Sequence, residues 1–175
     1  MYSPDAYHRA LVFAAGKHRE QKFPGSDLPY LVHVVTVASE VIAHLPRLAL
    51  DDPDLGVVCA LLHDTIEDTA TTYAEVAESF GAAVADGVAA LSKDPSLPKE
   101  RKMPDTLERI QRSRREIWVV KLADRIANMD APPHYWTQEK RLSYREEAAL
   151  IADTLGSAAP VLEARLRERI AAYPV

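Results

Sequence analysis

Apolar residues recur along the chain with the period of an α-helix, and no segment shows the strict alternation that is typical of a half-buried strand. Glycine is scarce, with 6 residues in 175, and prolines fall between the periodic segments. The clearest stripe at helical spacing consists of Leu31, Val34, Val35, Ala38, Val41, Ile42 and Leu45. The pattern therefore predicts an all-α fold.

Capping and turn residues set the expected limits of the helices. The first helix should begin at Pro4, with Ser3 as its N-cap, and end before the turn cluster at 24–27. The segment 53–66 is apolar nearly all round, which predicts a central helix. The segment 92–105 carries three prolines and many charges, so we expect a loop with at most short helical turns. Further helices are expected at about 29–46, 72–80, 82–92, 114–129, 137–155 and 157–171.

Length, charge and cysteine content narrow the class of protein. A chain of 175 residues suits one domain, which we take as 1–175. The net charge of −5 argues against bulk binding to nucleic acid or to acidic membranes. No apolar run approaches the roughly 20 residues needed to span a bilayer, and the N-terminus lacks a signal-peptide pattern. Because the single cysteine, Cys59, excludes an intrachain disulfide, a reducing cytoplasm is the expected location.

The sequence LLHDTIED, residues 61–68, places four ionisable groups at the end of an apolar helix. His63 and Asp64 diverge by about 100° on a helix, and both can still touch one ion that lies beyond the helix end between them. Glu67 lies four residues after His63 and three after Asp64, hence on the same side of the helix. Asp68 follows Asp64 at the same four-residue spacing. Burying these carboxylates is costly unless a cation compensates them, and a divalent metal would do so. On these eight residues alone, a solvated helix end explains the pattern equally well.

Two other stretches favour the metal hypothesis. Lys121, Asp124, Arg125 and Asn128 form a narrow polar stripe at i, i+3, i+4 and i+7 on an otherwise apolar helix. By itself this is an ordinary amphipathic surface helix, but its narrowness indicates a polar face that lines a cleft. His33 stands beside the apolar stripe of the segment 29–46, where a lone histidine is more often a core residue than a ligand.

Taken together, the sequence offers two imidazoles and two carboxylates on three predicted helices: His33, His63, Asp64 and Asp124. Mixed nitrogen and oxygen ligands favour Mn²⁺, Fe²⁺ or Zn²⁺ over Ca²⁺. A structural zinc site is disfavoured because there is only one cysteine.

Three motifs in this order resemble the RelA/SpoT-type alarmone hydrolases of the HD superfamily. HDTIEDT resembles their HDxxEDT motif, and KLADRIANM resembles their KLADRLHNM. GKHREQ followed by LPYLVH resembles their opening HxGQ…PYxxHP. The resemblance runs from about residue 7 to Tyr144, leaving the helical segment 145–171 outside it, and is closest in kind to the small stand-alone members. The HD dipeptide alone is weak evidence, whereas HDxxEDT with LADR some 60 residues later is specific.

This resemblance implies a fold, an activity and a set of roles. The fold would be a single HD-domain helical bundle with a central metal site, and the activity would be hydrolysis of the 3′-pyrophosphate of (p)ppGpp to GDP or GTP and pyrophosphate. One Mn²⁺ ion is implied, with Fe²⁺ or Zn²⁺ as substitutes, and Glu67 and Asp68 match the catalytic acidic pair. Asn128 and Tyr144 match positions that contact the nucleotide. The metal ligands implied are His33, His63, Asp64 and Asp124.

A local excess of positive charge supports an anionic small-molecule substrate. Residues 93–115 carry eight Lys or Arg against four Asp or Glu, although a solvated loop and helix face is the default explanation of such a run. Lys99 within LPK is the first candidate for holding a pyrophosphate, with Arg101 and Lys102 beside it. Lys22 is a second candidate, at the place where the family often has an arginine.

Departures from the family pattern keep alternatives open. The family's proline after the first motif histidine is Val34 here, and its aromatic residue or histidine before the motif asparagine is Ala127. The same fold acting on (p)ppApp, or on the 2′-phosphate of NADPH, is therefore a second hypothesis. A non-catalytic sensor that binds a nucleotide is a third. The oligomeric state is left open, with a homodimer as one option.

Overall fold

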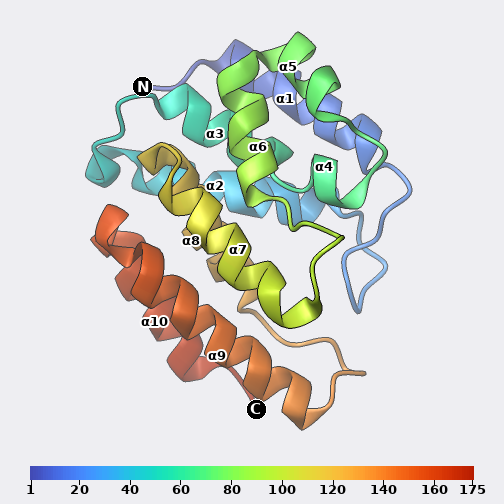
Figure 1. Cartoon of the computed structure of the whole chain (residues 1–175), viewed down its shortest axis with the longest axis vertical. Helices are drawn as coiled ribbons and strands as arrows, with labels where there is room; N and C mark the ends of the chain where they lie inside the picture. The colour runs from blue at the N-terminus through green and yellow to red at the C-terminus, as the bar shows by residue number, and fades with distance from the viewer.

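The computed structural model describes all 175 residues, and its named elements are all helical (Figure 1). The prediction of an all-α fold is confirmed. The α-helices are α1 (Pro4–Lys17), α2 (Leu31–Leu48), α3 (Pro53–Leu62), α4 (Thr65–Asp68), α5 (Tyr73–Phe80), α6 (Ala82–Leu91), α7 (Lys99–Gln111), α8 (Arg115–Asn128), α9 (Gln138–Leu155) and α10 (Pro160–Ala172), with a 3₁₀ turn at Gly156–Ala158.

Side-chain caps start several helices where the sequence predicts them. The Ser3 hydroxyl accepts a hydrogen bond from the backbone N–H of Ala6 at the start of α1. Asp52 accepts from the N–H of Leu55 at 3.0 Å, and Pro53 occupies the first position of α3. These contacts satisfy backbone donors that a helix leaves free at its N-terminus. The starts of α1 and α3 therefore follow from local sequence.

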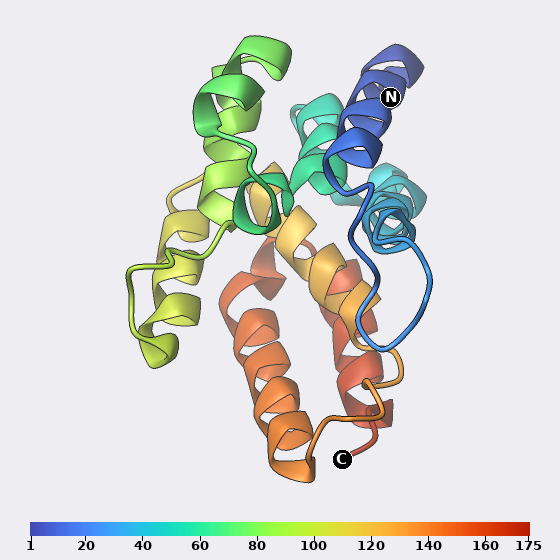
Figure 2. The same ribbon diagram turned by 90° about the vertical axis from the view of Figure 1, so that its right-hand side faces the viewer.

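The core is built around α3, which packs against α1, α2, α6 and α8. Every residue from Leu55 to Leu62 is buried, as expected for a central helix. At opposite ends of the molecule lie two helix pairs, α5 with α6 and α9 with α10 (Figures 1 and 2). The helix α2 is long and apolar enough to cross a membrane by length and composition alone, but it packs on α3 and α8 and carries the buried His33.

The structure overturns the expected loop at 92–105. The helix α7 begins at Lys99 and contains Pro104, and only the residues before Lys99 form a loop. Met103, Leu107 and Ile110 recur at helical spacing and are buried, so packing of this face outweighs the unfavourable proline.

The ends of two helices also differ from the prediction. The helix α1 ends at Lys17, before the expected end near residue 23, and α2 continues past Pro46 to Leu48.

The expected helix 53–66 is divided in two, and the division lies at the candidate site. The helix α3 ends at Leu62, and α4 begins at Thr65. The buried Thr65 hydroxyl donates to the carbonyl of Leu62 at 2.7 Å, which satisfies a free acceptor at the end of α3. His63 and Asp64 therefore occupy a junction between two helices.

Candidate functional site

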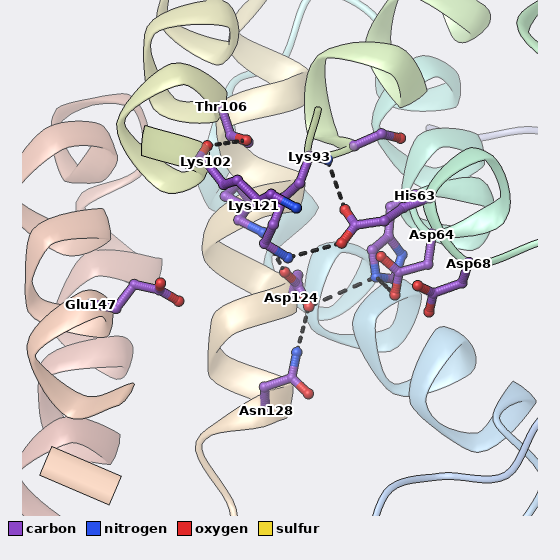
Figure 3. Close-up of polar contacts among 12 residues, drawn as sticks. His63, Asp64, Asp68, Lys93, Lys102, Thr106, Lys121, Asp124, Asn128 and Glu147 are labelled. Atoms are coloured by element: carbon purple, nitrogen blue, oxygen red, sulfur yellow. Dashed lines mark hydrogen bonds and ion pairs between the residues drawn. The ribbon is translucent and has the colours of Figure 1, made fainter. Parts of the chain in front are cut away.

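Four side chains from three parts of the chain converge at the centre of the molecule. Figure 3 labels three of them, His63, Asp64 and Asp124. His33 comes from α2, His63 and Asp64 from the α3–α4 junction, and Asp124 from α8. The Nε2 atoms of His33 and His63 are 3.3 Å apart, and His63 Nε2 lies 2.8 Å from Asp64 Oδ2. Asp124 Oδ1 lies 3.5 Å from His33 Nε2 and 3.7 Å from His63 Nε2. The four residues predicted as a group are therefore brought together.

Hydrogen bonds to His63 and Asp64 help to hold this arrangement. The Nδ1 of His63 bonds the carbonyl oxygen of Ala60 at 2.8 Å, which leaves Nε2 as the ring nitrogen that faces the cluster. The Tyr30 hydroxyl donates to Asp64 Oδ2 at 2.5 Å. Burial, together with the charge of Asp64, raises the pKa of Tyr30 above its ordinary value, so the hydroxyl stays a donor.

Helical spacing on α8 supplies the contacts of Asp124. Lys121, three residues earlier, donates to Asp124 Oδ2 at 2.9 Å, and Asn128, four residues later, donates to Oδ1 at 2.6 Å. Burial opposes ionisation of Asp124, but Lys121 and the two imidazoles hold its pKa well below the usual range. Its carboxylate is thus kept in the form that can bind a cation.

The geometry of the donor set fits a divalent metal. Two ligands that bind one ion at right angles, each about 2.1 Å from it, lie about 3 Å apart. One ring nitrogen from each of His33 and His63 and one carboxylate oxygen of Asp64 lie within 4.8 Å of one another. Burial opposes protonation of His63, yet the adjacent carboxylates outweigh it and raise its pKa to about 9. This attraction for a proton shows that the pocket favours positive charge at its centre.

The acidic pair lies beside this cluster, and each carboxylate has its own partner. Glu67 accepts from the backbone N–H of Lys93 at 2.8 Å and from its ammonium at 3.0 Å. Asp68 Oδ2 accepts from the side-chain amide of Gln21 at 3.0 Å. Burial, followed by the charge of Asp64, raises the pKa of Asp68. The two neighbouring carboxylates therefore occupy different electrostatic environments.

Both carboxylates open into a cavity of about 360 Å³ between α4, α7, α8 and α9. Four of the six predicted substrate contacts line it: Lys99, Lys102, Asn128 and Tyr144. The cavity is acidic beside Asp64 and cationic towards α7 and α9, where Lys99, Lys102 and Lys140 lie. Such a gradient suits a ligand whose phosphates need both a metal and ammonium groups.

The other two predicted contacts lie outside the lining of this cavity. Lys22 is exposed, and its ammonium donates to the carbonyl of Asp27 in its own loop. Arg101 is also exposed, on a face of α7 that does not line the cavity. Asn128, although it lines the cavity, is engaged with Asp124.

Several lining residues were not among the predicted contacts. Tyr30 stands in the PYLVH stretch, three residues before His33, and helical spacing could have placed it on the same side. Lys140 lies one turn before Tyr144 on α9, with its ammonium 6.0 Å from the centre of that ring. Lys93 follows α6 in a loop, where no periodic signal exists. Arg125 and Glu147 form an ion pair that links α8 to α9, and Arg125 stacks on Tyr144.

A family model described as HD domain matches residues 10–156. The chain belongs to the HD-domain family. The predicted membership of the HD superfamily is thereby confirmed, together with the HD-type helical bundle. The HD domain and its His/His/Asp cluster suggest a divalent metal site.

Relatives of this HD-domain protein cover nearly its full length. It is 33% identical to guanosine-3′,5′-bis(diphosphate) 3′-pyrophosphohydrolase MESH1 of Danio rerio, over 89% of this chain and 87% of that one. It is 34% identical to MESH1 of Homo sapiens, over 90% of this chain and 89% of that one. A solved structure described as "A metazoan ortholog of SpoT hydrolyzes ppGpp and plays a role in starvation responses" superposes with a TM-score of 0.85 at 29% identity, covering 98% of this chain and 97% of that chain.

Proposed function

We propose that this HD-domain protein is a metal-dependent hydrolase that removes the 3′-pyrophosphate of guanosine-3′,5′-bis(diphosphate). The observation that carries the proposal is the juxtaposition of the His33, His63, Asp64 and Asp124 cluster with the acidic pair at one end of a lysine-rich cavity. Relatives that share a third of its residues over most of the chain bear the name of this activity.

The reaction requires two proton movements close to one phosphorus atom. A water molecule forms a bond to the phosphorus attached to the ribose 3′ oxygen, and the bond from that phosphorus to the 3′ oxygen breaks. The water loses a proton, and the departing oxygen gains one, so that pyrophosphate and a 3′-hydroxyl result. We assign these proton movements to Glu67 and Asp68, which lie beside the cluster and line the cavity.

Four residues would hold the metal: His33, His63, Asp64 and Asp124. When bound, a divalent ion supplies Lewis-acid stabilisation of the phosphoryl oxygens and a more acidic water. We propose Mn²⁺ as the ion, as the family resemblance implies, with Fe²⁺ or Zn²⁺ as substitutes, because two imidazoles and two carboxylates suit all three. Lys121 and Asn128 keep the Asp124 carboxylate in place for this purpose.

The cationic side of the cavity would bind the remaining phosphates. Lys99 and Lys102 extend from the first turns of α7, and neither forms an ion pair with a carboxylate of the protein. Tyr144 offers an aromatic face and a hydroxyl to the nucleoside. Lys22 and Arg101 lie farther away and are proposed only as contacts for groups that project out of the cavity.

Turnover of the purified, Mn²⁺-loaded protein on ppGpp, ppApp and NADPH, assayed side by side, tests the proposal. Released pyrophosphate must be distinguished from released phosphate. We expect pyrophosphate from ppGpp, and a much slower but measurable release with the Glu67→Gln variant. A preference for ppApp would change the assigned base from guanine to adenine. Release of phosphate from NADPH, with no turnover of ppGpp or ppApp, would overturn the assignment of an alarmone as the substrate. Absence of turnover with metal bound would favour a nucleotide sensor.

A further inference from the structure

The carboxylate of Glu67 is held at both of its oxygen atoms by a single residue that no motif includes. The backbone N–H of Lys93 donates to Oε2 at 2.8 Å, and its ammonium donates to Oε1 at 3.0 Å. The two residues are 26 positions apart, on either side of α5 and α6. Both side chains are partly buried at the wall of the cavity.

The Lys93 loop is itself fixed by an arginine from α7. Arg109 donates to the carbonyl oxygens of Ala89 at 2.7 Å, Ala90 at 3.1 Å and Ser92 at 2.8 Å. These are acceptors that the C-terminal end of α6 cannot satisfy by itself. Asp105 holds the same guanidinium at 2.8 Å. The carbonyl of Ser92 belongs to the peptide group whose N–H points at Glu67, so its position fixes the direction of that donor.

We infer that Lys93 is the positioning residue of Glu67, and that it sets the orientation of this carboxylate for the hydrolysis proposed above. The inference rests on the proposed function. Charge-assisted hydrogen bonds to both oxygens restrict the carboxylate of Glu67 to one orientation. A group that transfers a proton near a fixed phosphorus atom needs such a defined orientation. Burial would lower the pKa of Lys93, but Glu67 outweighs it and raises the pKa above its ordinary value, so the ammonium persists.

The direct test compares Lys93→Met with Lys93→Arg in steady-state turnover of ppGpp. Lys93→Met keeps the backbone donor and a side chain of similar length, but loses the charge. Loss of a supporting contact around a metal centre typically costs about 10- to 100-fold in activity. We expect a fall of that size in kcat, little change in KM, an unchanged Mn²⁺ content and partial recovery in Lys93→Arg.

A matched control separates positioning from attraction of the substrate. Lys102 lines the same cavity and carries the same charge, but it makes no hydrogen bond to Glu67. We expect Lys102→Met to raise KM more than it lowers kcat, the opposite of Lys93→Met. If both variants change KM alone, Lys93 binds substrate and the inference is wrong.

A double-mutant cycle completes the test. In a Glu67→Gln background, Lys93→Met should cause no further loss of kcat, because its effect acts through the carboxylate that is already gone. An equal loss in both backgrounds, or loss of bound Mn²⁺ in Lys93→Met, would overturn the inference while leaving the proposed function intact. A wild-type protein that releases no pyrophosphate would overturn the proposed function itself, and the inference with it.

Discussion

Addition of metal should stabilise this protein, and the size of the effect can be worked out without an activity assay. At the centre of the fold, each of the two imidazoles lies 2.8 to 3.7 Å from a carboxylate oxygen of Asp64 and of Asp124, and the imidazoles lie 3.3 Å from each other. His33, His63 and Asp124 are almost fully buried. Because α2, α3 and α8 hold these groups in place, binding needs little rearrangement, and the unfolded chain has no equivalent site.

Metal that binds only the folded state raises the free energy of unfolding, and therefore the melting temperature. A metal at 100 times its dissociation constant, bound only to the folded state, adds about 2.7 kcal/mol to the free energy of unfolding. In a domain of this size each kcal/mol shifts the melting temperature by roughly 2–4 °C, so we expect an increase of about 5–11 °C. The measurement is thermal unfolding, followed by circular dichroism, with EDTA and then with excess Mn²⁺.

The matched variants are His63→Ala and His8→Ala. His63 lies in the cluster, whereas His8 is exposed on α1. We expect the Mn²⁺-dependent increase to disappear in His63→Ala and to persist in His8→Ala. An increase of equal size in His63→Ala, or none in the wild-type protein, would refute the assignment of the cluster as a metal site.

Three further predictions concern catalysis, loop anchoring and the core. His63→Ala and Glu67→Ala should both abolish ppGpp turnover, but only His63→Ala should lose bound metal when measured by elemental analysis; full activity in either would contradict the mechanism. Arg109→Met should lower the free energy of unfolding by about 2 kcal/mol in urea titration, because a charged donor to three carbonyls is lost. Leu122→Ala, in the fully buried face of α8, should cost about 2–5 kcal/mol in the same assay, and a cost below 1 kcal/mol would contradict its place in the core.

Some features of this molecule follow from short stretches of sequence. The 3.6-residue period and the caps at Ser3 and Asp52 place α1 and α3, because each depends on residues within one or two turns. Short-range spacing also explains why the sequence predicted Lys121, Asp124 and Asn128 on one polar face of a helix. Contacts at i+3 and i+4 are fixed by helix geometry alone.

Other features depend on packing between distant segments. The helix α7 forms through a predicted loop because the buried face of Met103, Leu107 and Ile110 outweighs the local effect of proline. The division of the expected helix at His63 also depends on packing against neighbouring helices, because that packing determines where the chain turns.

The sequence by itself determined the helical class, the family and the candidate ligands, since periodicity and motifs are properties of neighbouring residues. Only the tertiary structure decided which charges reach the site. Lys22, Lys99, Arg101 and Lys102 were all candidate substrate contacts, yet only Lys99 and Lys102 line the cavity. Lys93 carries no motif at all, and its contact with Glu67 exists because α7 fixes the end of α6. The physical reason is that the position of a flexible charged side chain depends on where its backbone is packed, which residue type and spacing do not specify.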